Sequence, residues 1–177
     1  MCAETPEVCR TPVTEQKAKL LLRNKLDDRK DKIVWKWSSG AATTKEEFGD
    51  PLATDDYVLC VYDGSGVRLS AVAPAGGVCR GPQVLCWADK PVGFNYKNKD
   101  LTPNGIFKLS LKAGTDGHAK IGLKGFGALL TMPDLATLTS PVTVQLHRSG
   151  GGACWGAEYS FPPDIRNDGV QFIDKAD

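Results

Sequence analysis

Apolar and polar residues alternate along most of this chain with a period of two. Residues 106–112 read IFKLSLK, residues 118–124 read HAKIGLK, and residues 142–148 read VTVQLHR. Successive side chains of a β-strand point to opposite faces, so each segment predicts one apolar face and one polar face. This pattern is typical of antiparallel strands with one buried side.

Ten strand-like segments follow one another, separated by short stretches rich in glycine, proline or charge. They span residues 17–24, 32–38, 57–63, 67–73, 84–89, 93–98, 106–112, 118–124, 142–148 and 153–159. Only TTKEEF at 43–48 suggests a helical turn, because a threonine can cap it and glutamates suit its first turn. The spacing predicts an all-β fold, a single antiparallel β-sandwich of about ten strands with at most one helical turn.

The length of 177 residues suits one domain, and 41% hydrophobic with 24% charged residues is typical of a globular chain. We expect residues 1–16 to be an N-terminal extension and residues 17–177 to be the β-sandwich domain. Pro162-Pro163 begins what reads as a polar tail, from which Ile165, Phe172 and Ile173 could pack against the sheet.

Charge and hydropathy exclude two classes of partner. Lys+Arg 22 against Asp+Glu 21 gives a net charge of +1, too small for a strong overall attraction to nucleic acid. No apolar run approaches the roughly 20 residues that span a bilayer. The opening MCAETPEVCRTP lacks the basic and apolar regions of a signal peptide. The protein is therefore either intracellular or begins after an export signal.

Six cysteines bear on that choice, and their even number suits three disulfides. They are Cys2, Cys9, Cys60, Cys79, Cys86 and Cys154. The pairs 2–9 and 79–86 have the spacing of local loop closures, which leaves 60–154 as a long bridge, although six cysteines allow 15 pairings. The alternatives are free buried cysteines in a cytosolic protein or a zinc site, for which no C-x2-C pair is present. We favour disulfides and hence export.

The residues that could carry catalysis are few. His118 and His147 are the only histidines, and neither a G-x-S-x-G nor an H-E-x-x-H motif is present. Carboxylates gather between Glu46 and Asp63, so a hydrolase with paired carboxylates is one alternative. A calcium site at Asp50, Asp55 and Asp56 is another, although a solvated loop is the simpler interpretation.

Two groups of side chains could contact a ligand. Trp87 and Trp155 each follow a cysteine, and an outward-facing ring there could stack on a sugar; the simpler interpretation places both in the core. Four lysines of the hairpin at 106–124 share one face and could hold an anionic glycan, or could simply keep the sheet soluble. They are Lys108, Lys112, Lys120 and Lys124.

Several long motifs follow one another along residues 17–177, among them KLLLRNKLDDRKDKIVWKW, CWADKPVGFNYKNKDLTPNGI, LKAGTDGHAKIGLKGFGALLTMPDL and VTVQLHRSGGGACWGAEYS. Together they resemble a domain found in large, uncharacterised, exported bacterial proteins. The resemblance implies a secreted or cell-surface module and no known activity. In that pattern the second and third cysteines are usually closer together, whereas Arg80 to Leu85 intervene here. Cys2 and Cys9 lie outside the matching region.

These observations favour a non-catalytic secreted or cell-surface module with a structural or adhesive role. We expect no enzyme activity and no cofactor. A carbohydrate-binding module that uses exposed Trp and Lys residues is the alternative, and a hydrolase is the second. The expected partner is a glycan or another surface protein, not nucleic acid.

The cysteine assignment predicts that the native protein has no free thiol. Thiol titration under denaturing, non-reducing conditions should give a value near zero. Six reactive thiols in freshly purified protein would contradict both the disulfides and the inference of export.

Overall fold

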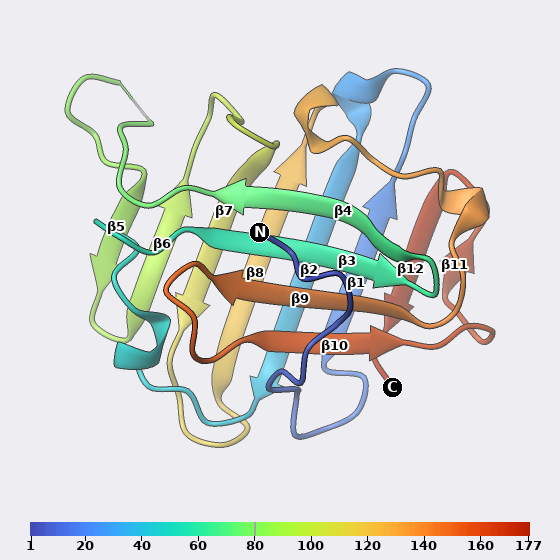
Figure 1. The fold of residues 1–177 in the computed structure, drawn as a ribbon, viewed down its shortest axis with the longest axis horizontal. Helices are drawn as coiled ribbons and strands as arrows, with labels where there is room; N and C mark the ends of the chain where they lie inside the picture. The colour runs from blue at the N-terminus through green and yellow to red at the C-terminus, as the bar shows by residue number, and fades with distance from the viewer. Residues whose placement is uncertain (80) are drawn as a thin grey trace.

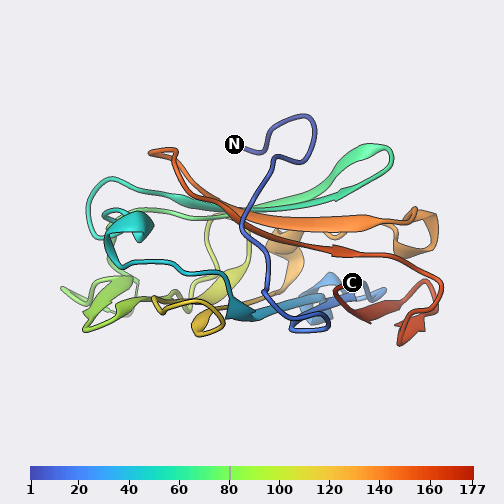
Figure 2. The same ribbon diagram turned by 90° about the horizontal axis from the view of Figure 1, so that it is seen from below.

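The computed structural model describes residues 1–79 and 81–177, so Arg80 lies outside the described residues. Two antiparallel sheets face each other as the two layers of a β-sandwich (Figure 1, Figure 2), which confirms the predicted fold class. The strands are β1 (Ala18–Arg23), β2 (Lys32–Gly40), β3 (Tyr57–Asp63), β4 (Gly66–Ala73), β5 (Trp87–Lys90), β6 (Gly93–Lys97), β7 (Ile106–Lys112), β8 (Ala119–Phe126), β9 (Val142–Arg148), β10 (Trp155–Tyr159), β11 (Arg166–Asn167) and β12 (Gln171–Lys175).

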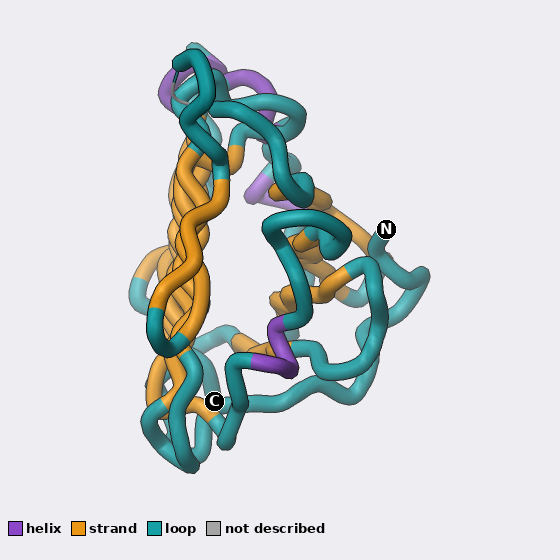
Figure 3. Tube along the Cα trace, turned by 90° about the vertical axis from the view of Figure 1, so that its left-hand side faces the viewer, coloured by secondary structure: helices purple, strands orange, loops and turns teal. Residues whose placement is uncertain are grey.

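The larger sheet has eight strands in the order β11-β12-β1-β2-β8-β7-β6-β5, and the smaller has the order β10-β9-β3-β4. The strands of the two layers cross at a wide angle instead of running side by side (Figure 1). One face of each sheet is turned to the shared core and one is turned outward (Figure 3). In the described residues no helix is long and apolar enough to cross a membrane.

The structure differs from the predicted elements mainly near the C-terminus. The predicted polar tail contains β11 and β12, and β12 pairs with β1 inside the larger sheet. Its sequence, QFIDK, hides the alternation because Asp174 occupies an inward position that an apolar residue normally fills. Four three-residue 3-10 turns take the place of the single expected helical turn: η1 (Asp28–Lys30), η2 (Glu46–Phe48), η3 (Ala128–Leu130) and η4 (Leu135–Thr137).

Two tryptophans of β2 connect the sheets through the core. The indole N–H of Trp35 donates to the Tyr159 hydroxyl at 2.9 Å, and that of Trp37 donates to the Gly156 carbonyl at 3.0 Å. Both acceptors belong to β10 of the smaller sheet, and both tryptophans are buried. A buried indole N–H without a partner costs free energy, so these bonds set the position of one sheet relative to the other.

The N-terminal extension lies across the outer face of the smaller sheet and then passes the edge of the sandwich (Figure 2). Cys2 bonds to Cys60 of β3, and Cys9 bonds to Cys154, the residue before β10. Two of the three predicted pairings, 2–9 and 60–154, are therefore wrong, whereas 79–86 is confirmed.

Sheet order explains the error in the long bridge. Cys60 is paired across the sheet with Gln145 of β9, and Gln145 is paired in turn with Gly156 of β10. One full strand thus separates Cys60 from Gly156 by about 9 Å at the usual strand spacing, and Cys154 lies two residues before Gly156 in the chain. A disulfide needs its Cα atoms within roughly 7 Å. Sequence alone did not reveal that β9 lies between them.

Backbone and side-chain contacts fix the same extension at its centre and at its end. The amide of Glu7 donates to the side chain of Gln145 at 3.1 Å, which donates back to the Glu7 carbonyl at 2.5 Å. The Arg10 guanidinium forms a two-pronged ion pair with Glu47 and lowers the pKa of that carboxyl to about 2. The extension therefore forms an integral part of the outer layer.

The extension should contribute strongly to stability through its bridges. On the chain-entropy account, the 145-residue separation of Cys9 and Cys154 corresponds to about 5 kcal/mol, and the seven-residue separation of Cys79 and Cys86 to about 2.5 kcal/mol. We expect Cys9→Ala/Cys154→Ala to lower the free energy of unfolding in urea more than Cys79→Ala/Cys86→Ala does. An equal or smaller loss would show that the extension is only loosely attached.

Candidate functional site

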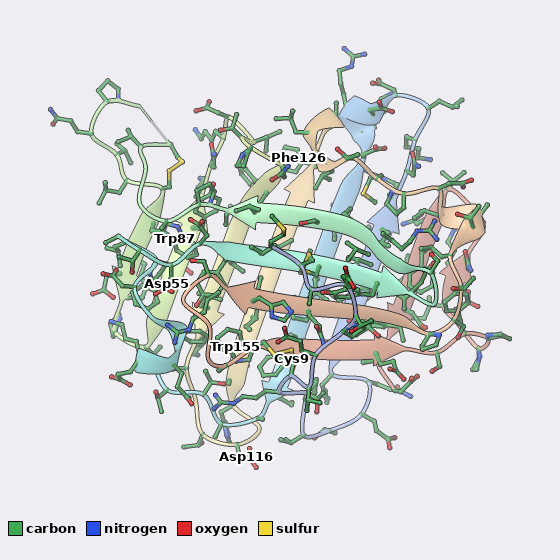
Figure 4. All side chains as sticks on the ribbon, viewed as in Figure 1. Cys9, Asp55, Trp87, Asp116, Phe126 and Trp155 are labelled. Carbon is green, nitrogen blue, oxygen red and sulfur yellow. A yellow bond between two sulfur atoms is a disulfide. The ribbon has the colours of Figure 1, made fainter. Side chains whose placement is uncertain are left out.

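The tryptophans proposed as ligand contacts both lie in the core (Figure 4). Trp87 is 2% exposed and donates its indole N–H to the Pro74 carbonyl at 2.7 Å. Trp155 is fully buried and donates to the Thr43 hydroxyl at 3.1 Å. Because neither ring reaches the surface, the prediction of an outward stacking tryptophan is wrong and the core interpretation holds.

The only exposed aromatic pair in the described residues is a poor substitute for such a platform. Phe107 and Phe126 lie on the larger sheet with their ring centroids 5.0 Å apart, but their planes are inclined by 45°. A flat sugar face stacks on one ring or on coplanar rings. This pair therefore offers no extended stacking surface.

The carboxylates considered for calcium or hydrolysis are engaged by the backbone. Asp55 accepts from the amides of Asp50 at 2.7 Å and Gly150 at 3.0 Å, and it lies 3.5 Å from the Arg148 guanidinium. A Cβ at position 150 would lie 2.2 Å from the Asp55 carboxylate, which explains the glycine there. Asp56 accepts from the Ala75 amide at 2.8 Å. These carboxylates brace loops and do not converge on one point.

Among the contacts of the described residues, neither histidine has both a nucleophile and an acid beside it. His118 contacts the Thr115 hydroxyl at 3.3 Å and the Asp116 carbonyl at 2.9 Å in an exposed turn, and His147 lies 4.0 Å from the Glu7 carboxylate. His147 lies 3.1 Å from the Gln145 side chain, and burial lowers its pKa. Within the described part of the chain, only His147, Cys9 and Cys154 form a potential metal-ligand group, and the two cysteines are already bonded to each other.

An acidic cavity of about 400 Å³ lies beside β12 and the loop after β10. Asp164, Asp174 and Asp177 line it, and burial is the main cause of a raised pKa at Asp174. The Asp177 carboxylate accepts a hydrogen bond from the Ser160 hydroxyl at 2.6 Å. These carboxylates do not form a compact ligand group among the described residues, so they do not make a metal site.

The outer face of the larger sheet carries the most unusual charge distribution of the molecule. Its five central strands, β1, β2, β8, β7 and β6, contain nine basic residues and no aspartate or glutamate. The nine residues all alternate with the buried positions and so point outward: Lys19, Arg23, Lys32, Lys36, Lys97, Lys108, Lys112, Lys120 and Lys124. None of them forms a salt bridge within the described residues.

We call this surface the lysine face. The predicted grouping of four hairpin lysines is part of it, because Lys108 is directly opposite Lys124, and Lys112 is directly opposite Lys120. Sequence reasoning missed the contribution of β1 and β2. Their place beside β8 follows from the order of strands in the sheet, for which the sequence holds no local signal.

The lysine face places like charges directly opposite one another on neighbouring strands. Lys19 is opposite both Lys36 and Lys175, and Lys108 is opposite both Lys97 and Lys124. A directly opposed pair of like charges destabilises a sheet by a few tenths of a kcal/mol up to about 1 kcal/mol. A soluble surface normally mixes charges of both signs, which this face does not do. The repulsion between its lysines therefore lowers the stability of the fold, and solubility does not account for the arrangement.

Comparison of the chain with protein-family models, curated proteins and solved structures finds no match. The assignment of a function therefore depends on the geometry and electrostatics described above.

The opposed lysines predict that reversing one charge stabilises the protein. Lys19→Glu should raise the free energy of unfolding by about 0.5–1 kcal/mol at low salt, because it replaces two repulsive pairs with attractive ones. Lys19→Gln should give a smaller increase, and both gains should shrink at high salt. Urea denaturation at two ionic strengths measures this, and a loss of stability in Lys19→Glu would contradict the assumed repulsion.

Proposed function

We propose that this protein is a non-catalytic module of the cell surface or extracellular space that adheres to negatively charged surfaces through its lysine face. The observation that carries the proposal is the separation of charge. The whole chain has a net charge of only +1, yet five adjacent strands present nine basic residues and no acidic residue on one side. Charges of one sign on a broad face attract oppositely charged partners at close range.

The disulfides support the location. Three bridges use all six cysteines, and disulfides persist in oxidising compartments such as the extracellular space. The resemblance to exported bacterial proteins agrees with this placement. The extension fastened by two of the bridges also favours a rigid module that withstands extracellular conditions.

The geometry gives less support to the two alternatives. A sugar-binding site based on tryptophan lacks its exposed rings, because Trp87 and Trp155 are buried. A hydrolase based on the loop carboxylates lacks free acid and base groups there, because Asp55 and Asp56 accept backbone hydrogen bonds. The lysine component of the carbohydrate-binding hypothesis remains and is part of the present proposal.

Adhesion can be tested with isolated bacterial cell envelopes, whose surface polymers are anionic. We expect the wild-type protein to bind them at low salt and to be released as salt screens the charges. Lys19→Glu/Lys124→Glu, with one change on β1 at the edge of the face and one on β8 at its centre, should abolish most of the binding. The control Lys25→Glu/Lys99→Glu changes the net charge equally at two exposed loop residues. Equal losses in both variants would refute the lysine face as the adhesive surface.

A further inference from the structure

At one end of the lysine face, a row of small or polar residues runs across strands β8, β7, β6 and β5 between two rows of lysines, and we call this strip the groove. These strands form the left-hand end of the larger sheet in Figure 1. A cavity of about 350 Å³ lies at its inner end, lined by Lys90, Asn95, Lys97, Lys108 and Ser110 among others. The groove runs perpendicular to the strands, because its residues are cross-strand partners and not neighbours in sequence.

The floor of the groove consists of small or neutral polar residues at successive register positions. Gly122 of β8 is opposite Ser110 of β7, Ser110 is opposite Asn95 of β6, and Asn95 is opposite Ala88 of β5. A Cβ added at Gly122 would meet no atom within 4 Å, so the space above this floor position is open. Neither Ser110 nor Asn95 makes a side-chain hydrogen bond with the described residues, which leaves a hydroxyl and an amide for a ligand.

Lysines form both walls of the groove. Lys124, Lys108 and Lys97 are successive cross-strand partners on one side. Lys120 and Lys112 are partners on the other side, and Lys90 continues that wall because both Lys112 and Lys90 are paired with Gly93. Along each strand, a wall residue lies two positions from the floor residue, so the two walls are about 13 Å apart. Four strands at the usual spacing give the groove a length of about 14 Å.

We propose that this groove binds a segment of a linear acidic polysaccharide, with its carboxylates or sulfates at the two lysine walls and its hydroxyls at Ser110 and Asn95. This inference rests on the proposed function, since it names the ligand and the part of the lysine face that binds it. The flat floor fits an extended chain that lies across the strands. Two positively charged walls on either side of a neutral polar floor match a polymer that has both acidic groups and hydroxyls.

The floor of the groove disfavours two other anionic ligands, single-stranded nucleic acid and lipid bilayers. The six wall lysines do not separate carboxylate or sulfate from phosphate, because an ammonium group attracts all three. The four floor positions have no aromatic ring on which the bases of a single-stranded nucleic acid could stack, and no large apolar side chain that could enter a lipid bilayer. Tyr96 and Leu109 also line the cavity but are only 2% and 1% exposed. The Phe107 ring beside one wall has the ammonium groups of Lys97 and Lys108 at 5.9 Å and 5.1 Å from its centroid.

The test measures binding of a uronate decasaccharide by isothermal titration calorimetry at low salt. Gly122→Leu fills the floor without changing any charge, and we expect it to weaken binding at least tenfold. Lys112→Gln/Lys120→Gln removes two opposed lysines of one wall and should have a similar effect. Lys25→Gln/Lys99→Gln removes the same charge from two exposed loop residues outside the lysine face and should change the affinity less than threefold. Thermal melting and a thiol titration check that each variant is folded.

Other outcomes overturn the inference in distinguishable ways. If wild type binds the decasaccharide but the groove variants weaken binding no more than Lys25→Gln/Lys99→Gln does, the groove assignment is wrong. If a thymidine oligonucleotide or a phosphatidylglycerol vesicle binds more tightly with the same dependence on Gly122, the ligand class is wrong. If none of these anionic probes binds the wild type, the proposed adhesive function fails as well. A neutral dextran oligomer should not bind.

Discussion

The hydrogen bonds that Trp35 and Trp37 donate to β10 are the constraint on which the rest of this structure depends. Both indoles are buried between the sheets, where an unpaired N–H would cost about 1–3 kcal/mol. Their acceptors belong to the opposite sheet, so the two layers can slide past one another only by breaking these bonds. Because β2 lies near the middle of the larger sheet, this link also fixes the surface that β2 presents on its other side.

The outer faces of the two sheets differ in composition and in what covers them. The smaller sheet has an apolar outer cluster of Val58, Cys60 and Tyr62, which the N-terminal extension covers and fastens through Cys2. No segment of the described residues covers the central strands of the larger sheet in this way, and lysines keep that face in contact with water. A sandwich whose one outer face is covered by its own chain can use only the other face for a broad contact. The location of the proposed binding surface follows from this asymmetry.

Local patterns predicted most of the fold because period-two alternation is a local property. All ten predicted strands are present, and the four hairpin lysines face the same side. The elements that were missed depend on long-range contacts or on a polar residue in a buried position. Asp174 is buried and interrupts the apolar alternation that would have predicted β12. Strand β9 lies next to β3 and so keeps Cys60 too far from Cys154 for a disulfide. Cysteine spacing predicted the short 79–86 bridge correctly, but the same spacing was misleading for Cys2 and Cys9, each of which bonds to a distant residue in or next to the smaller sheet.

The net charge of a whole chain can conceal a strongly charged face such as the lysine face. A net charge of +1 argues against a strong overall field, but it gives no information on where the charges lie. Strand order collects lysines from segments as far apart as Lys19 and Lys124, and the pleat turns all of them outward. Repulsion between these lysines lowers stability, while the disulfides and the tryptophan bonds between the sheets raise it. A rigid core can thus sustain a strained surface charge pattern, and a bound polyanion would remove that strain. The cost in the free protein and the affinity for a ligand then have the same physical origin.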